Sequence, residues 1–143
     1  MTTAHDVLRQ AQLYTDDTLY CLIHLPAAAI TAAAGVLAEI NTPFSALVAD
    51  KDEVSLLLPQ AEWEDFAHRL PDHQTESGYR LITFDVVLDM NLIGFLALVS
   101  GILAEAGVPV LAVSAFQRDH ILVQAGHFDA AWAALRRAQA SEA

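Results

Sequence analysis

Cysteine, basic residues and charge as a whole are scarce in this sequence. Its 143 residues include one cysteine, so no disulfide can form within the chain, which fits a reducing compartment. Seven basic and eighteen acidic residues give a net charge of −11. Nucleic acids and anionic membrane surfaces attract basic proteins, and this charge balance disfavours both. We therefore expect neither nucleic acid nor membrane among the partners.

We also expect neither a targeting leader nor a membrane-spanning segment. The opening MTTAHDVLRQ is polar, which is not typical of a signal peptide. The uncharged run at residues 90–104 has 15 residues and would reach roughly 23 Å as a helix, short of the roughly 30 Å of a bilayer core. We therefore expect a cytoplasmic protein.

Motifs for catalysis and metal binding are few. The sequence has no glycine-rich phosphate loop and no nucleophile elbow. Cys21 and His24 lie three positions apart in an expected strand, so their side chains point to opposite faces. Asp85 and Asp89 could pair as acid and base, but they also fit an edge or interface residue and a helix N-terminal charge. We expect no enzyme, no catalytic residue, no cofactor and no metal.

The chain is rich in apolar residues, 55% of the total, and it repeats itself. Residues 35–43 read GVLAEINTP and residues 101–109 read GILAEAGVP. The alignment continues without gaps to residues 60 and 126, and it places Glu53 on Asp119. Two copies of one supersecondary unit, related as a pseudo-twofold pair, are therefore predicted.

Each copy predicts the order β-α-β-β-α. The expected elements of the first copy are a strand at 19–25, a helix at 26–40, a hairpin at 44–49 and 54–58, and a helix at 62–70. Those of the second copy are a strand at 80–88, a helix at 92–106, a hairpin at 109–116 and 120–124, and a helix at 127–138. Asn91 and Gly107 fit the N-cap and C-cap of the helix at 92–106.

A sixth strand would complete the ferredoxin-like unit. The first copy can borrow the strand at 80–88 or one from its partner. The second copy has no further segment after Ala138, so either the copies complete each other or a helix covers the open edge. Val7, Leu8, Ala11 and Leu13, at helical spacing, fit such a covering helix. The expected boundaries are an extension at 1–16, repeats at 17–70 and 79–138, a polar linker at 71–78 and a tail at 139–143.

The second copy runs as an apolar strand, a loop ending in Leu-x-Gly, a helix ending in Leu-Ala-Glu-Ala-Gly, and a hairpin whose last strand opens with Asp-His. This pattern resembles the ACT domain, and in particular the ACT repeats of small tandem proteins related to the cytosolic arginine sensor of animals. The matching segments are LIG (92–94), LAEAG (103–107), VSAF (113–116), DHILV (119–123), YCLIHLP (20–26) and PFSALVADKDEVSLLLP (43–59). The resemblance covers about residues 17–138. It implies an α+β fold of two tandem ferredoxin-like ACT repeats, βαββα(β), with antiparallel sheets.

The resemblance implies binding rather than catalysis. ACT domains are regulatory modules that often bind an amino acid at an interface between two of them. In the arginine-sensor group the acid at the position of Asp119 contacts the ligand, and the glycine-containing loop before the helix closes over it. That sensor carries four repeats and this chain carries two, so we expect a homodimer; the identity of the ligand is not carried over.

The residues themselves are compatible with this chemistry. A helix N-terminus at residues 91–95 offers unpaired N–H groups to a carboxylate, and Gly94 allows close approach. Asp119 can hold an ammonium by charge-assisted hydrogen bonds. We therefore expect a small amino acid or related metabolite, held at a repeat–repeat interface, to contact Asp119, Asn91, Leu92, Ile93, Gly94, Ser114 and Phe116.

Plainer interpretations stay open. Asp119 also fits a turn residue of a short hairpin, Gly94 a relief of helix crowding, and His120 a packed strand residue. The whole chain also fits a structural dimerisation module without a ligand, or a small enzyme on a ferredoxin-like fold.

Overall fold

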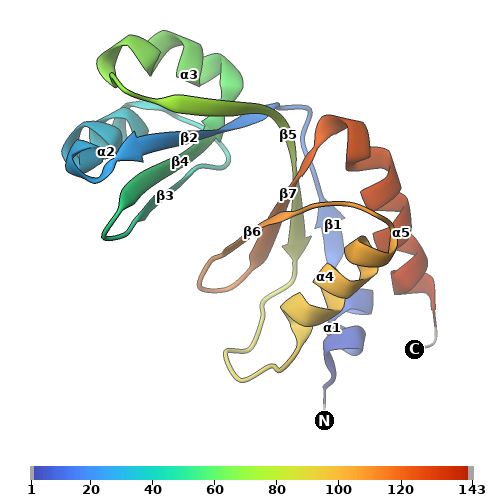
Figure 1. The fold of residues 1–143 in the computed structure, drawn as a ribbon. Helices are drawn as coiled ribbons and strands as arrows, with labels where there is room; N and C mark the ends of the chain where they lie inside the picture. Colours follow the sequence, from blue (N-terminus) through green and yellow to red (C-terminus); the bar gives the residue numbers. More distant parts are fainter. Residues whose placement is uncertain (1, 142–143) are drawn as a thin grey trace. The chain divides into compact units, whose positions relative to one another are not determined.

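The computed structural model describes residues 2–141, which form two compact units (Figure 1). The inserted unit is Thr18–Tyr79, and the split unit comprises residues 2–17 and 80–141. Strand β5 (Gln74–Asp85) contributes residues 74–79 to the inserted unit and residues 80–85 to the split unit. Within the described residues the fold is mixed α/β, with antiparallel strand pairs and five α-helices.

The inserted unit has the order β-α-β-β-α-β. Its elements are β2 (Tyr20–Pro26), α2 (Ile30–Glu39), β3 (Ala46–Ala49), β4 (Glu53–Pro59), α3 (Gln60–Phe66) and residues 74–79 of β5. Short 3-10 turns at Ala27–Ala29 and Ala67–Arg69 adjoin the two helices. The strands pair in the order β3-β4-β2-β5. This unit therefore has its own sixth element in the first half of β5.

The core of the inserted unit follows from strand alternation. Cys21, Ile23 and Leu25 lie on one face of β2 and are fully buried. They pack with alternate residues of β4 against Val36 of α2 and Trp63 of α3. The sheet thus buries one face beneath its two helices.

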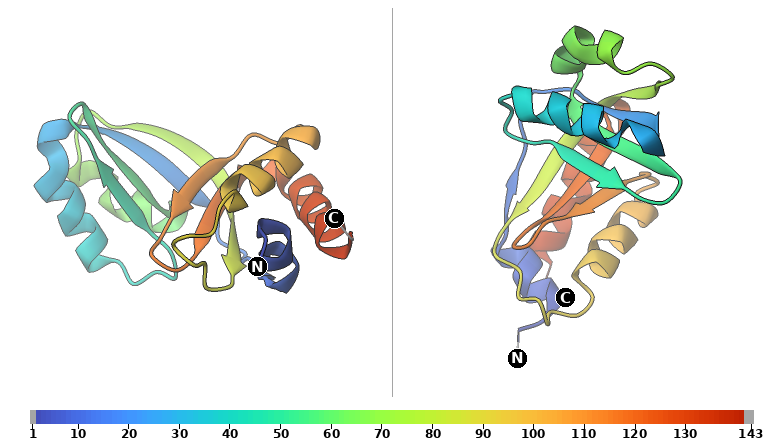
Figure 2. Two further views of the ribbon diagram at one scale, coloured as in Figure 1. Left: turned by 90° about the horizontal axis from the view of Figure 1, so that it is seen from below. Right: turned by 90° about the vertical axis from the view of Figure 1, so that its left-hand side faces the viewer.

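The split unit is assembled from both ends of the described chain. Its elements are α1 (Ala4–Gln10), β1 (Gln12–Tyr14), residues 80–85 of β5, α4 (Phe95–Glu105), β6 (Leu111–Ser114), β7 (Asp119–Gln124), a 3-10 turn (Ala125–His127) and α5 (Phe128–Ala140). The strands lie in the order β1-β5-β7-β6. Helices α1, α4 and α5 pack together over one face (Figure 2). Their apolar residues form one core with Phe84 and Ile121.

The N-terminal segment corrects one expectation. The spacing of Val7, Leu8, Ala11 and Leu13 predicts a single covering helix, but α1 ends before Ala11, whose backbone is extended (φ −68°, ψ 134°). Leu13 lies in β1, opposite Phe84 of β5. β1 therefore supplies the strand that the second copy was expected to lack. Three residues are too few for strand alternation to show in a sequence, so only the helical part of the pattern was visible.

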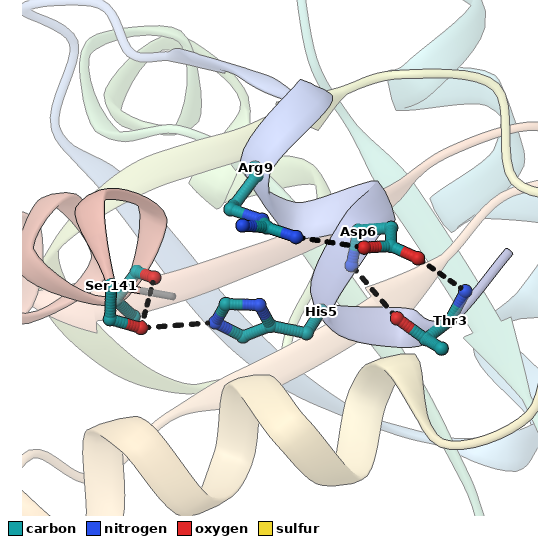
Figure 3. A network of polar contacts seen from close by, with 6 residues as sticks. Thr3, His5, Asp6, Arg9 and Ser141 are labelled. Carbon is teal, nitrogen blue, oxygen red and sulfur yellow. Dashed lines mark hydrogen bonds and ion pairs between the residues drawn. The ribbon is translucent and has the colours of Figure 1, made fainter. Parts of the chain in front are cut away.

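Polar contacts hold the start of the chain (Figure 3). Thr3 and Asp6 form a reciprocal capping box, each side chain accepting the other's backbone N–H at 3.1 Å. Arg9 donates to the Asp6 carboxylate at 2.9 Å. The Thr3 backbone bond, followed by the Arg9 bond, lowers the pKa of Asp6 to about 2. His5 Nε2 lies 3.1 Å from Ser141 Oγ, which connects α1 to the residue after α5.

A second link joins the end of α1 to α5. The side-chain amide of Gln139 donates to the carbonyls of Leu8 and Ala11, at 2.9 and 2.7 Å. Leu8 lies in the last turn of α1 and Ala11 is its C-cap, so Gln139 gives both carbonyls at this helix end a donor from α5. α1 and β1 are therefore integral parts of the split unit.

The structure differs from the expected boundaries. Residues 74–78, expected in a linker at 71–78, begin strand β5 and pair with β2, with Thr75 opposite Ile23. Their side chains are exposed, so backbone pairing rather than apolar burial forms this strand, and no hydrophobic pattern could reveal it. The expected extension at 1–16 contains α1 and β1, and residues 139–140 of the expected tail end α5. Residues 1, 142 and 143 lie outside the described residues.

No helix within residues 2–141 is long and apolar enough to cross a membrane.

Replacing Leu8 by alanine tests whether α1 belongs to the core. Leu8 is fully buried among α1, α4 and α5, so Leu8→Ala should lower the free energy of unfolding by about 2–5 kcal/mol in urea denaturation. Exposed Gln10→Ala is the control and should change it by less than about 0.5 kcal/mol. An equally small effect of Leu8→Ala would show that α1 does not pack on this core.

Candidate ligand-binding site

A pocket of about 490 Å³ lies in the split unit, where the loop after β5, the start of α4 and the β6–β7 hairpin meet. Its lining residues are Leu88, Asp89, Met90, Leu92, Gly94, Phe95, Leu96, Ala97, Ser114, Ala115, Phe116 and Asp119. A volume of this size is typical of small-molecule sites. All of its walls come from one unit.

Asp119 is a nearly buried acid in the lining of this pocket. It is the first residue of β7 and shares a face with Ile121 and Val123, which pack under the helices. Only 9% of its surface is exposed. Within residues 2–141 no ion pair involves Asp119, and the adjacent Arg118 instead donates to Asp85 at 2.9 Å. A carboxylate at a nearly buried position that faces a pocket favours a cationic partner, and a ligand can supply one.

The start of α4 forms a second polar wall. Gly94 precedes the helix with a left-handed backbone (φ 85°, ψ 10°), and no side chain caps the helix. The first closing bond runs from the Leu98 N–H to the Gly94 carbonyl at 2.9 Å, so the N–H groups of the first turn lie outside the intrahelical ladder. Together with the helix dipole they favour an anion. A carboxylate and the start of a helix, which favour ions of opposite sign, thus line one pocket.

The loop between β5 and α4 is held at both sides. The Leu88 N–H donates to the Gln117 carbonyl in the hairpin turn at 2.7 Å. The Asp89 carboxylate accepts the Asn91 N–H at 2.8 Å, and the Asp89 carbonyl accepts the Leu92 N–H at 3.0 Å. The first bond fixes the loop against the hairpin, and the other two fix the turn within the loop. The pocket lies between the loop and the hairpin.

The structure brings five of the seven expected site residues into this pocket: Leu92, Gly94, Ser114, Phe116 and Asp119. Asn91 does not line it; it lies in a neighbouring hollow with Val86 and Val87. Ile93 is 89% exposed and also lies outside the lining.

The expected N-cap at Asn91 is wrong, because α4 begins at Phe95 rather than at residue 92. Asn and Asp side chains compete with helices by forming local turns, and the Asp89–Asn91 bond is such a turn. The helix start therefore moves to Gly94. The glycine of the Leu-x-Gly loop could have indicated this helix start from the sequence, because glycine adopts a positive φ most readily.

Several lining residues were not expected from the sequence. They are Leu88, Asp89, Met90, Phe95, Leu96, Ala97 and Ala115. Most are apolar residues, and in the sequence they are typical of an ordinary strand, loop or buried helix face. Once the helix is known to start at Phe95, its first turn would have identified three of them.

His120 and Cys21 do not line this pocket. His120 lies next to Asp119 on β7, with Nδ1 2.8 Å from Thr83 Oγ1. Cys21 is fully buried in the inserted unit, and burial, with a smaller effect of Glu64, raises the pKa of its thiol to about 12. Such a thiol stays protonated at neutral pH and is a weak nucleophile. Within residues 2–141 no group of three or more His, Cys, Asp or Glu side chains could hold a metal.

Residues 74–137 match the family model described as the ACT domain, and this segment includes the whole pocket. It is somewhat less than half of the chain. A search of curated proteins found no match.

Solved structures resemble the chain over most of its length. A crystal structure of a protein from Agrobacterium tumefaciens is 23% identical, with a TM-score of 0.71 and an alignment over 90% of this chain and 89% of that one. A Vibrio cholerae protein of unknown function is 21% identical, with a TM-score of 0.69 and 92% of both chains aligned. The regulatory subunit of aspartate kinase from Thermus flavus is 11% identical, with a TM-score of 0.67 over 90% of this chain and 97% of that one. At these identities the likeness concerns the fold, and with the family match it supports an ACT-domain protein.

Replacing Gly94 by alanine tests the helix start. A Cβ at Gly94 would meet no atom within 4 Å, so the cost of Gly94→Ala is backbone strain alone, about 1–2 kcal/mol of unfolding free energy. Gly101→Ala, inside α4 without a positive φ and with equal space, should instead stabilise the protein by about 0.5–1 kcal/mol. Equal effects of the two substitutions in urea denaturation would contradict the left-handed conformation.

His120 predicts a pH dependence of stability. Burial lowers its pKa; Asp119 opposes this and Arg118 adds to it. Above the ordinary histidine pKa of about 6.5, the protein keeps its full stability because His120 is neutral in both the folded and the unfolded chain. As the pH falls below that value, the unfolded chain binds a proton more readily than the folded one, and the free energy of unfolding decreases. Urea midpoints should therefore fall more between pH 7.5 and 5.5 in the wild type than in His120→Gln, whose amide can still bond Thr83. Parallel curves would contradict the lowered pKa.

Proposed function

We propose that the chain is a regulatory ACT protein of two tandem repeats that binds a small amino acid in the pocket of the split unit. The ligand's ammonium contacts Asp119, and its carboxylate lies at the first turn of α4. The observation that carries this proposal is Asp119, a nearly buried acid that forms no ion pair within residues 2–141 and lines the same pocket as the start of α4, which no side chain of those residues caps. The ammonium and the carboxylate of a free amino acid are thus each placed beside a group of opposite charge.

Two further findings support a regulatory role. The ACT match covers the pocket, and one structural neighbour is described as a regulatory subunit of aspartate kinase. Both units also share the segment order β-α-β-β-α and the same spatial order of four strands, as expected of tandem repeats; the fourth strand of the split unit, β1, comes from the start of the chain. The protein in this proposal has no catalytic role; it acts by changing its packing when the ligand binds, and it does so in the cytoplasm.

The rim of the pocket supports closure by a second copy. Met90 and Phe116 are 75% and 80% exposed, and Ile93 lies nearby on the same loop. A homodimer that covered these side chains would bury the ligand at an interface between repeats. The same apolar rim favours the second candidate, a dimerisation module without a ligand.

A thermal-shift screen against the twenty amino acids separates the two candidates. An amino acid at 100 times its dissociation constant should stabilise the protein by about 2.7 kcal/mol. Asp119→Asn should reduce this stabilisation to about half or less, because it removes the charge that holds the ammonium.

Glu53→Gln is the matched control. Glu53 is the counterpart of Asp119 in the repeat alignment, but it lies outside the pocket, within 4.0 Å of His24. It should leave the shift unchanged. If no amino acid raises the melting temperature of the wild type, amino-acid binding is wrong and the dimerisation module is favoured.

A further inference from the structure

The charges of the pocket lining are all of one sign. Asp89 and Asp119 line the pocket, and the lining includes no lysine, arginine or histidine. One of the two, Asp119, is assigned to the ligand's ammonium. A second carboxylate, on the ligand's side chain, would meet no cation and would be repelled by Asp89. We therefore expect the pocket to bind acidic amino acids weakly.

A basic side chain would gain little. Asp89 is exposed, and one of its carboxylate oxygens already accepts the Asn91 N–H at 2.8 Å. Ion pairs of exposed carboxylates contribute little because water screens them. The charged end would also give up hydration against the apolar walls.

The remaining walls favour an apolar side chain. Leu88, Met90 and Leu92 line the pocket from the loop, Leu96 from α4, and Phe116 from the hairpin turn. Met90 and Phe116 are largely exposed. A ligand that covers their side chains removes apolar surface from water, and this burial makes the free energy of binding more favourable. The more apolar surface the ligand presents, the larger this gain.

We infer that the pocket selects amino acids with an uncharged apolar side chain of about the size of leucine, methionine or phenylalanine. This inference rests on the proposed function and adds its ligand class. Asp119 and the start of α4 hold the groups common to all amino acids, and the apolar walls choose among them. Phe116 is the specificity-determining residue that this division of roles identifies.

Calorimetric titration with leucine, methionine, phenylalanine, alanine, glutamate and lysine tests the ligand class. At least one of the first three should bind about tenfold or more tightly than alanine, as one or more buried methylene groups allow. Glutamate and lysine should bind more weakly than that ligand. If glutamate or lysine binds most tightly, the inference is wrong while amino-acid binding stands; if none binds, both fall.

Phe116→Ser separates selection from general binding. Phe116 is 80% exposed, so its replacement should leave the fold intact. The affinity for the preferred apolar ligand should fall about tenfold, whereas the affinity for alanine, which is too short to cover the ring, should stay the same. Val87→Ser, another exposed apolar residue but outside the lining, should change neither. Equal losses for both ligands in Phe116→Ser would contradict its role in specificity.

Discussion

The carboxylate of Asp119, a nearly buried residue that shares a pocket with the start of α4, is the constraint on which the functional interpretation depends. An aspartate with 9% of its residue surface exposed ordinarily has a cation or a set of donors, and within residues 2–141 no ion pair supplies a cation here. The first turn of α4 favours a negatively charged group instead, because its N–H groups have no partner within the helix. A zwitterion satisfies both at once, and a simple cation or anion satisfies only one.

The fold places these two walls together by ordinary means. Strand alternation turns Asp119 to the helix-covered face of β7, and the αL backbone of Gly94 lets the chain turn into α4 directly after the loop. The bond between Leu88 and Gln117 holds the loop against the hairpin. The helices that cover this face are in turn held by α1, which Gln139 links to α5. The N-terminal segment thus supports the site without lining it.

Much of this was accessible from the sequence, and the failures have identifiable causes. The internal repeat and the run of apolar segments predicted most strands and helices of both units, and the resemblance identified the loop at Gly94 and Asp119 as candidate ligand contacts. Strand β1 and the polar first half of β5 were missed because backbone pairing with distant segments forms them, and pairing leaves no local hydrophobic pattern. Asn91 was misplaced because a local turn with Asp89 competes with helix capping. The apolar lining was missed because only the fold shows which apolar residues face a pocket.

The most direct test of the central claim is a thermodynamic cycle between Asp119 and the ligand's ammonium. Titration calorimetry of the wild type and Asp119→Asn, each with leucine and with its α-hydroxy counterpart 2-hydroxyisocaproate, isolates that one contact. If the carboxylate holds the ammonium, the coupling free energy should be about 1.5–3 kcal/mol, as for a hydrogen bond to a charged group. A coupling near zero, with leucine still bound, would show that the ammonium lies elsewhere and would contradict the role assigned to Asp119.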